Sequence, residues 1–253
     1  MKEYKLPRIM YGYSGLEPHI DEATMKLHHL THHANYVKGT NKVFDEHSEG
    51  LMLHEVLEEV CIKKHKGYDS ADFKNLLLMA GGHFNHTFYF KLMNPPRKSE
   101  TEIDEQLYEL IKLKWGTLEK FKEFFETKAL KTVGSGWVYL VYASETVELF
   151  EETEIGTLSN KMGTKIVLNK GELHIVATKN QEMPLMYSKH LIPIIAMDIW
   201  EHAYYIKHNA NKKGYVHDFF CVLDWSFVST VFLKTKDSKE KLCVDYDGEL
   251  LFK

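Results

Sequence analysis

Four residues in three distant stretches of the sequence could together bind a metal ion: His28, His86, Asp198 and His202. They lie within LHHLTHHAN, NHTFY and DIWEHAYY. Three imidazoles and one carboxylate suit a redox-active first-row metal such as manganese or iron. A closed structural zinc site would more often use thiolates, and none of the three cysteines is placed to join this set. If the four residues converge, the chain is a redox metalloenzyme.

The composition excludes several classes of partner. With 253 residues, a formal net charge of -4 and a pI near 6.4, the chain gives no global reason to expect nucleic acid or a membrane surface as partner. No apolar run approaches the roughly 20 residues of a membrane-spanning helix. Cys61, Cys221 and Cys243 are odd in number and far apart, which favours reduced thiols. We therefore expect an intracellular protein of the cytoplasm or the mitochondrial matrix.

Helices must position the first two histidines. Apolar residues recur at helical spacing in the first half of the chain. Within the first helix, His28 and His32 are four residues apart and should share one face. The Gly81-Gly82 pair in a later helix favours a close approach to another group. The expected helices cover 21–43 (loosening near Gly39), 51–65, 70–93 and two shorter stretches within 101–131, divided near Trp115 and Gly116.

Strands must position the carboxylate. After Gly134-Ser135-Gly136 the sequence becomes β-branched and alternating in WVYLVYAS, TVELFEE, TKIVLNK and ELHIVAT, which is typical of strands. The short apolar run LIPIIAMDIW indicates a further strand that ends at Asp198. Residues 216–233 return to a helical pattern.

This order of elements predicts an α+β fold. We expect an N-terminal helical hairpin domain, residues 1–95, that supplies His28 and His86. A C-terminal mixed α/β domain with a small antiparallel sheet, residues 96–253, should supply Asp198 and His202. Within it, an inserted hairpin region near 146–165 could extend the sheet or form a partner surface, and residues 234–253 form a C-terminal extension.

Five segments in this order resemble the iron/manganese superoxide dismutase family over roughly Leu6 to Leu233. The resemblance implies dismutation of superoxide to dioxygen and hydrogen peroxide at one metal ion per subunit, with His28, His86, Asp198 and His202 as the protein ligands. The segments are LEPHIDEATMKLHHLTHHANYV, GGHFNHTFYF, GSGWVYLVY, TKNQEMPL and DIWEHAYYIKHNANKKGY.

The same resemblance implies roles around the metal. His32 and Tyr36 would line the channel for superoxide. Gln181 would hydrogen-bond a metal-bound solvent molecule and connect it to Tyr36. Trp137 and Trp200 would wall the site. In a homodimer, with a tetramer as the alternative, Glu201 would reach the partner's His202 and Tyr215 would reach the partner's His32.

The metal can also be inferred from the resemblance. In the iron-type pattern the solvent-bonding glutamine stands at the position that is Gly82 here. In the manganese-type pattern that position is glycine and the glutamine comes from the strand region, as Gln181 does after Asn180. We therefore expect manganese, with iron or use of both metals as the alternative.

Two other functions compete with dismutation. A non-catalytic subunit of a larger assembly could use the same fold, and the insertion and the tail motivate this alternative. A mononuclear iron oxygenase would use two histidines and one carboxylate. The third histidine leaves too few open coordination positions for that chemistry, so it ranks last.

Overall fold

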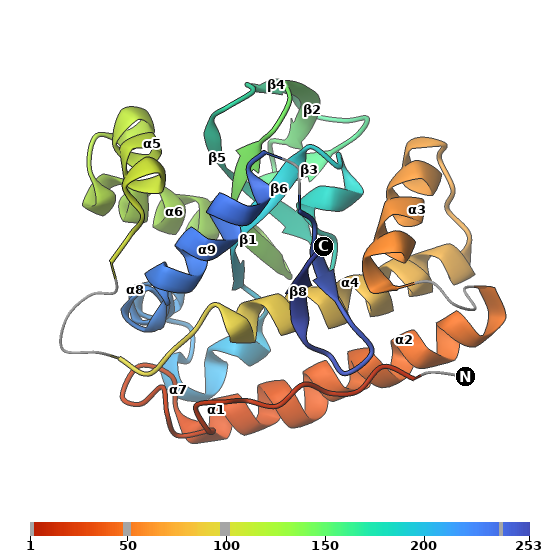
Figure 1. Ribbon diagram of the computed structural model, residues 1–253, viewed down its shortest axis with the longest axis horizontal. Coiled ribbons are helices and arrows are strands. Elements are labelled where there is room, and N and C mark those ends of the chain that lie inside the picture. The colour runs from red at the N-terminus through yellow and green to blue at the C-terminus, as the bar shows by residue number, and fades with distance from the viewer. Residues whose placement is uncertain (1–2, 48–51, 97–101, 238–239) are drawn as a thin grey trace.

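The structure, a computed structural model, describes residues 3–47, 52–96, 102–237 and 240–253. Its first half is a helical hairpin. The helical segments α1 (Glu22–Leu27), η1 (His28–His33) and α2 (Ala34–His47) follow one another without a break and run along one edge of the molecule (Figure 1). After α3 (Leu53–His65), α4 (Ala71–Lys91) packs along α2. The helical N-terminal part expected from the sequence is confirmed.

The first helix differs from the expected one in its winding and its length. Its central segment η1 is a π-helix, which begins at His28 and includes His32. π-Helical segments are rare in proteins, and those that occur often lie at functional sites. The predicted loosening near Gly39 is wrong, because α2 continues to His47. A Cβ atom at Gly39 would overlap the Met79 side chain of α4, so glycine here allows close helix packing.

The second half is built on a three-stranded antiparallel sheet of order β5-β1-β6. Its strands are β1 (Gly136–Ala143), β5 (Leu173–Lys179) and β6 (Leu191–Asp198). In the central strand, Trp137 lies opposite Asp198 of β6 and Thr178 of β5. This register places the Trp137 indole beside the last residue of β6. The small antiparallel sheet predicted from the sequence is confirmed.

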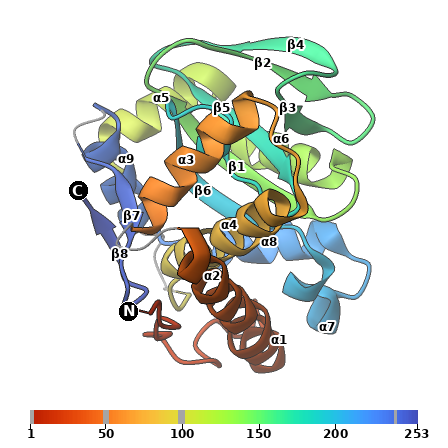
Figure 2. The same ribbon diagram turned by 90° about the vertical axis from the view of Figure 1, so that its right-hand side faces the viewer.

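Helices surround this sheet, as both ribbon views show (Figures 1 and 2). Asp104 and Thr117 cap α5 and α6 with side-chain oxygens that accept backbone N–H groups. The single helical pattern expected over 216–233 is two helices, because Leu223 is extended after the first and Asp224 caps the next. The bounds are α5 (Glu105–Trp115), α6 (Leu118–Lys131), α7 (Tyr205–His208), α8 (Lys212–Val222) and α9 (Trp225–Thr235), with short 3₁₀ turns η2 (Pro184–Met186) and η3 (Glu201–Ala203).

The insertion forms a small sheet of its own. It contains β2 (Val147–Glu152), β3 (Thr157–Ser159) and β4 (Thr164–Leu168), in the order β3-β2-β4. The strand β3 was not expected. This sheet lies at the end of the molecule opposite α1 and α2 in both views (Figures 1 and 2).

The tail forms a hairpin of β7 (Leu242–Val244) and β8 (Leu250–Phe252). The hairpin contacts α3 and α4, so the C-terminal extension packs on the N-terminal helices. The ion pair between Lys91 Nζ and Glu249 Oε2, 2.6 Å apart, adds to this contact. No helix within the described ranges is long and apolar enough to cross a membrane.

Candidate metal centre

The structure brings the four candidate ligands together from four elements. His28 opens η1, His86 lies in α4, Asp198 ends β6 and His202 lies in η3. Their ligand atoms all lie within 4.8 Å of one another. His28, His86 and Asp198 are at most 1% exposed. The strand expected to end at the site does so, and His202 follows it in a separate turn.

The donor atoms of this cluster fit a metal ion. Asp198 Oδ2 lies 3.1 Å from His28 Nε2, 3.2 Å from His202 Nε2 and 3.7 Å from His86 Nε2. The buried Nε2 atoms of His28 and His86 nevertheless have no hydrogen-bond partner among the residues that the structure describes. Buried polar atoms are normally paired. A cation among these atoms supplies the missing partner, so the arrangement is that of a ligand set.

One ligand is already oriented for coordination. His86 Nδ1 lies 2.7 Å from the carbonyl oxygen of Gly82. This oxygen can only accept, so Nδ1 carries the proton and the Nε2 lone pair faces the cluster. Asp198 is fixed in the same way, because its Oδ1 accepts the Trp200 backbone N–H at 2.8 Å.

The charges of the cluster also suit a cation. Burial lowers the pKa of His28 to about 4 and holds that of His86 well below its ordinary value, so both imidazoles stay neutral. Burial opposes ionisation of Asp198, but His202 and His28 outweigh it and keep its pKa low. Neutral imidazoles with one carboxylate are in the protonation state that metal binding requires.

Aromatic rings enclose the cluster. The Trp137 ring meets His86 edge-on at 5.2 Å between centroids, and Trp200 stacks on His202 at 5.6 Å. His32 stacks on His202 at 3.8 Å with an interplanar angle of 14°. Both His32 and Tyr36 are partly exposed, unlike His28. The sequence-predicted wall and channel residues therefore all border the cluster.

Gln181 is held from two sides. Its Oε1 accepts from Trp137 Nε1 at 2.9 Å, and its Nε2 donates to Tyr36 Oη at 3.0 Å. The link from Gln181 to Tyr36 was anticipated, but the Trp137 bond was not. A Cβ atom at Gly82 would overlap the Tyr36 ring, so this glycine gives Tyr36 its place beside His86.

Two further residues support Gln181. Asn85 Nδ2 donates to the Gln181 carbonyl oxygen at 3.1 Å, and Tyr139 Oη donates to Asn85 Oδ1 at 3.0 Å. The sequence predicts only an aromatic wall position for Tyr139 and no role in the site for Asn85. The sequence signal for Asn85 is a polar residue next to a candidate ligand, in the buried part of a helix.

The interpretation of Tyr215 is wrong. Its side chain is fully buried, and its hydroxyl lies 3.0 Å from the Tyr89 hydroxyl. A side chain enclosed in this way cannot reach a second subunit. Tyr205, three residues after His202, is 49% exposed, and Glu201 is exposed as well.

The fold and the site define a metalloprotein with a centre of three histidines and one carboxylate. Residues 3–94 match the profile of the iron/manganese superoxide dismutases, alpha-hairpin domain, and residues 103–168 and 162–231 match their C-terminal domain in two overlapping segments. The chain is also 36% identical to the superoxide dismutase [Mn] of Buchnera aphidicola subsp. Acyrthosiphon pisum (strain APS), over 89% of this chain and 97% of that protein. The chain belongs to the iron/manganese superoxide dismutase family.

Proposed function

We propose that this protein dismutates superoxide to dioxygen and hydrogen peroxide at one manganese ion per subunit, held by His28, His86, Asp198 and His202. The observation that carries the proposal is the convergence of these four donors, with unpaired buried Nε2 atoms, in a chain of this family. Manganese, when bound there, supplies the one-electron oxidation of one superoxide and the one-electron reduction of the next.

Tyr36 and Gln181 supply the proton chemistry in this proposal. Peroxide leaves as a neutral molecule only if the site delivers protons. Burial raises the pKa of Tyr36 to about 12, so its hydroxyl keeps its proton at neutral pH. Because Tyr36 Oη accepts from Gln181 Nε2, its own O–H is available to donate elsewhere. The second N–H of the Gln181 amide can hold a water molecule in the site.

The source of the glutamine favours manganese over iron. The Gly82 backbone lies against the Tyr36 ring, so no longer side chain fits at this position. The amide must therefore come from Gln181, as in the manganese-type pattern. The relative named for manganese covers nearly the whole chain. Iron remains the alternative, since the same nitrogen and oxygen donors accept it.

Metal exchange tests both parts of the proposal. The protein is stripped of metal, reloaded separately with manganese and with iron, and assayed for superoxide dismutation at measured occupancy. Activity mainly with manganese is expected. Equal activity with iron would contradict the manganese preference and leave the activity intact. If the site were fully occupied by either metal and the protein were still inactive, the proposed dismutase activity would be contradicted and the hypothesis of a non-catalytic subunit would be favoured. The iron oxygenase hypothesis is dropped, because the third histidine joins the cluster.

We also propose that two copies of the chain associate beside the metal centre. Leu27, Leu30, Tyr205 and Ile206 are each at least 37% exposed. They lie on α1, η1 and α7, and α1 contacts α7. Glu201 is exposed next to this apolar surface and is the candidate to reach the partner's His202. Tyr205 replaces Tyr215 as the candidate interface tyrosine.

Sedimentation analysis tests the dimer. Ile206→Lys places a charge on the proposed interface and should raise the dimer dissociation constant. Leu113→Lys, at an 83% exposed position of α5, is the matched control and should leave the constant unchanged. A monomeric wild type, or equal effects of the two variants, would contradict the proposed interface. A tetramer, and the cellular compartment, stay predictions from the sequence.

A further inference from the structure

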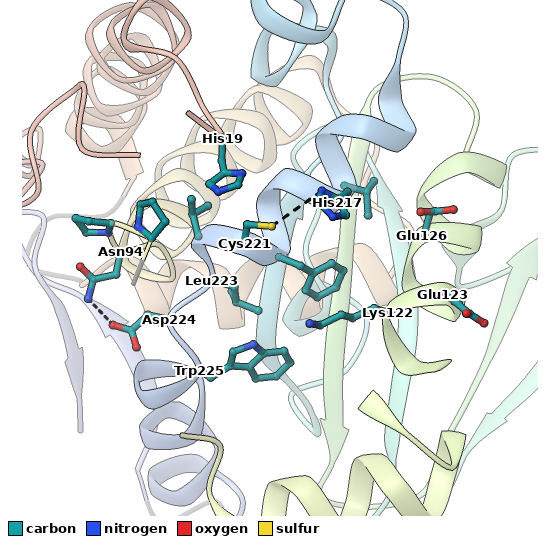
Figure 3. A pocket seen from close by; sticks show the side chains of 15 residues that line it. His19, Asn94, Lys122, Glu123, Glu126, His217, Cys221, Leu223, Asp224 and Trp225 are labelled. Carbon is teal, nitrogen blue, oxygen red and sulfur yellow. Dashed lines mark hydrogen bonds between the residues drawn. The ribbon is translucent and has the colours of Figure 1, made fainter. Parts of the chain in front are cut away.

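A second group of side chains that could hold a metal ion lies between the segment before α1 and the helix α8. It comprises His19, Asp218 and Cys221, whose ligand atoms lie within 4.8 Å of one another, and His217 beside them. We call these four residues the α8 cluster. It shares no residue with the four ligands of the metal centre. Figure 3 shows His19 facing Cys221, with His217 on the other side of the thiol.

Helical spacing brings three members of the cluster to one face of α8. Asp218 and Cys221 are three residues apart, and His217 and Cys221 are four apart. Cys221 Sγ lies 4.0 Å from His217 Nδ1, which lies 3.5 Å from Asp218 Oδ1. His19 comes from a remote part of the chain, and its Nδ1 lies 2.9 Å from the same Asp218 oxygen.

Lys207 holds Asp218 and the His19 backbone in place but does not bind the Asp218 Oδ1 atom that faces the cluster. Lys207 Nζ binds Asp218 Oδ2 at 2.8 Å and also donates to the carbonyl oxygens of Pro18 and His19. It thereby ties the His19 backbone to α8 and leaves Asp218 Oδ1 for the cluster. Burial opposes the charge of Asp218, but hydrogen bonds from Lys207 and His19 outweigh it, and the pKa of this carboxyl lies below its ordinary value.

An unpaired nitrogen also lies against this carboxylate. The His208 side chain is only 9% exposed, and its Nε2 lies 3.5 Å from Asp218 Oδ2. That atom has no hydrogen-bond partner within the described part of the chain. Burial lowers the pKa of His208, so it adds a neutral imidazole rather than a positive charge. Asp218 is thus bordered by three histidines and one thiol.

A pocket of about 480 Å³ gives solvent access to the cluster. His19, His217 and Cys221 line it (Figure 3). The same lining holds three carboxylates, Glu123, Glu126 and Asp224, against one lysine, Lys122, and Glu126 is also paired with Lys213 at 3.1 Å, so one negative charge remains in excess. The exposed charge around the entrance therefore favours a cation over an anion.

We propose that the α8 cluster binds a zinc ion that links the segment before α1 to α8. A thiolate, imidazoles and a carboxylate form the donor set that zinc takes, whereas manganese prefers sites without sulfur. Zinc–ligand bonds of about 2.0 to 2.3 Å put neighbouring donor atoms roughly 3.5 Å apart, so small side-chain rotations suffice. Zinc replaces the proton between His19 Nδ1 and Asp218 Oδ1 and the proton of the Cys221 thiol, and both protons are released to solvent.

The test uses the manganese-loaded protein, so that the metal centre is already filled. Zinc is added, unbound metal is removed, and zinc and manganese per subunit are measured by mass spectrometry. Cobalt then replaces zinc as a spectroscopic probe. The metal centre contains no sulfur ligand, so a thiolate-to-cobalt charge-transfer band reports a cysteine ligand elsewhere.

A matched pair of cysteine variants identifies the ligand. Cys61 Sγ lies 3.7 Å from His65 Nδ1, four residues further along α3, so this pair resembles Cys221 with His217. No carboxylate and second histidine complete a ligand cluster around Cys61 in the ranges described. The wild type and Cys61→Ser should each take up one zinc beyond constant manganese and show the cobalt band. Cys221→Ser should lose both signals, and His19→Gln should weaken zinc binding by roughly tenfold or more.

Dismutation by Cys221→Ser and His19→Gln should equal that of the wild type, which confirms that both variants fold. Zinc uptake that displaces manganese without adding to it would overturn the proposal. So would a cobalt band that survives Cys221→Ser or that disappears in Cys61→Ser. If the zinc affinity of His19→Gln equalled that of the wild type, His19 would not be a ligand, and the proposed link between the segment before α1 and α8 would be wrong.

Discussion

The two halves of the metal centre are held in place by different forces. On the helical side, His28 and His86 sit in helices whose buried faces pack against each other, with Phe90 against the His28 ring. On the strand side, Asp198 and Gln181 stand at the end of a strand and in a loop. There, individual hydrogen bonds from Trp137, Asn85 and the Trp200 backbone fix the geometry. Packing therefore dominates on the first side and directional bonds on the second.

Removing one ligand from each side should have the largest effect. His86→Ala and Asp198→Asn should both abolish metal retention and dismutation. The first deletes a donor, and the second removes the only negative charge among the four ligands. Metal content and activity are measured together. His65→Ala, at an exposed side chain of α3 outside both clusters, is the control for histidine replacement. Activity without metal in either variant would refute the ligand assignment.

Loosening the strand side without touching a ligand should have an intermediate effect. Gln181→Ala removes both side-chain bonds and should lower kcat by about 10- to 100-fold, the usual range for groups that orient a metal site. Trp137→Phe keeps a ring beside His86 but removes the N–H bonded to Gln181, and should cost less. Stopped-flow dismutation at equal metal occupancy measures both. A larger loss in Trp137→Phe would show that the ring, not the hydrogen bond, matters most.

The helical side is better tested by packing changes. Gly82→Ala and Gly39→Ala both insert a methyl group between α2 and α4. At Gly82 it meets the rigid Tyr36 ring, and at Gly39 it meets the flexible Met79 side chain. Overpacking costs typically 1 to 3 kcal/mol, so Gly82→Ala should lose about 2 kcal/mol and Gly39→Ala about 1. Urea unfolding measures both. If Gly39→Ala were more destabilised than Gly82→Ala, the rigidity of the neighbouring side chain would not determine the cost of the added methyl group.

The sequence predicts the elements on both sides of the metal centre, including the strand that ends at Asp198, but not the local detail of either side. The spacing of apolar residues was enough to place His28 and His86 on helices, and the order of elements predicted the α+β fold. Three features have no local signal. The π-helix at His28 depends on tertiary packing, which an α-helical pattern does not reveal. The separate sheet β3-β2-β4 depends on strand pairing. The burial of Tyr215 depends on which face of α8 meets α4.

Buried histidines on the helical side should make this half sensitive to acid. His33 Nε2 lies 3.1 Å from His83 Nδ1, and both rings are fully buried. Burial lowers the pKa of His83 to about 3 and that of His33 well below its ordinary value. Below about pH 6.5 the unfolded chain gains protons that the folded chain refuses, so the free energy of unfolding falls as pH falls.

Replacing one of these histidines isolates its contribution to the slope. His83→Gln removes one titrating group, so between about pH 6 and pH 4 its unfolding free energy should fall less steeply than that of the wild type, by up to about 1.4 kcal/mol per pH unit. Urea unfolding at several pH values measures this slope, independently of any constant loss of stability. Parallel lines for His83→Gln and the wild type would show that His83 takes up a proton in the folded protein. The pH dependence of the unfolding free energy could then not be assigned to this buried histidine of the helical side.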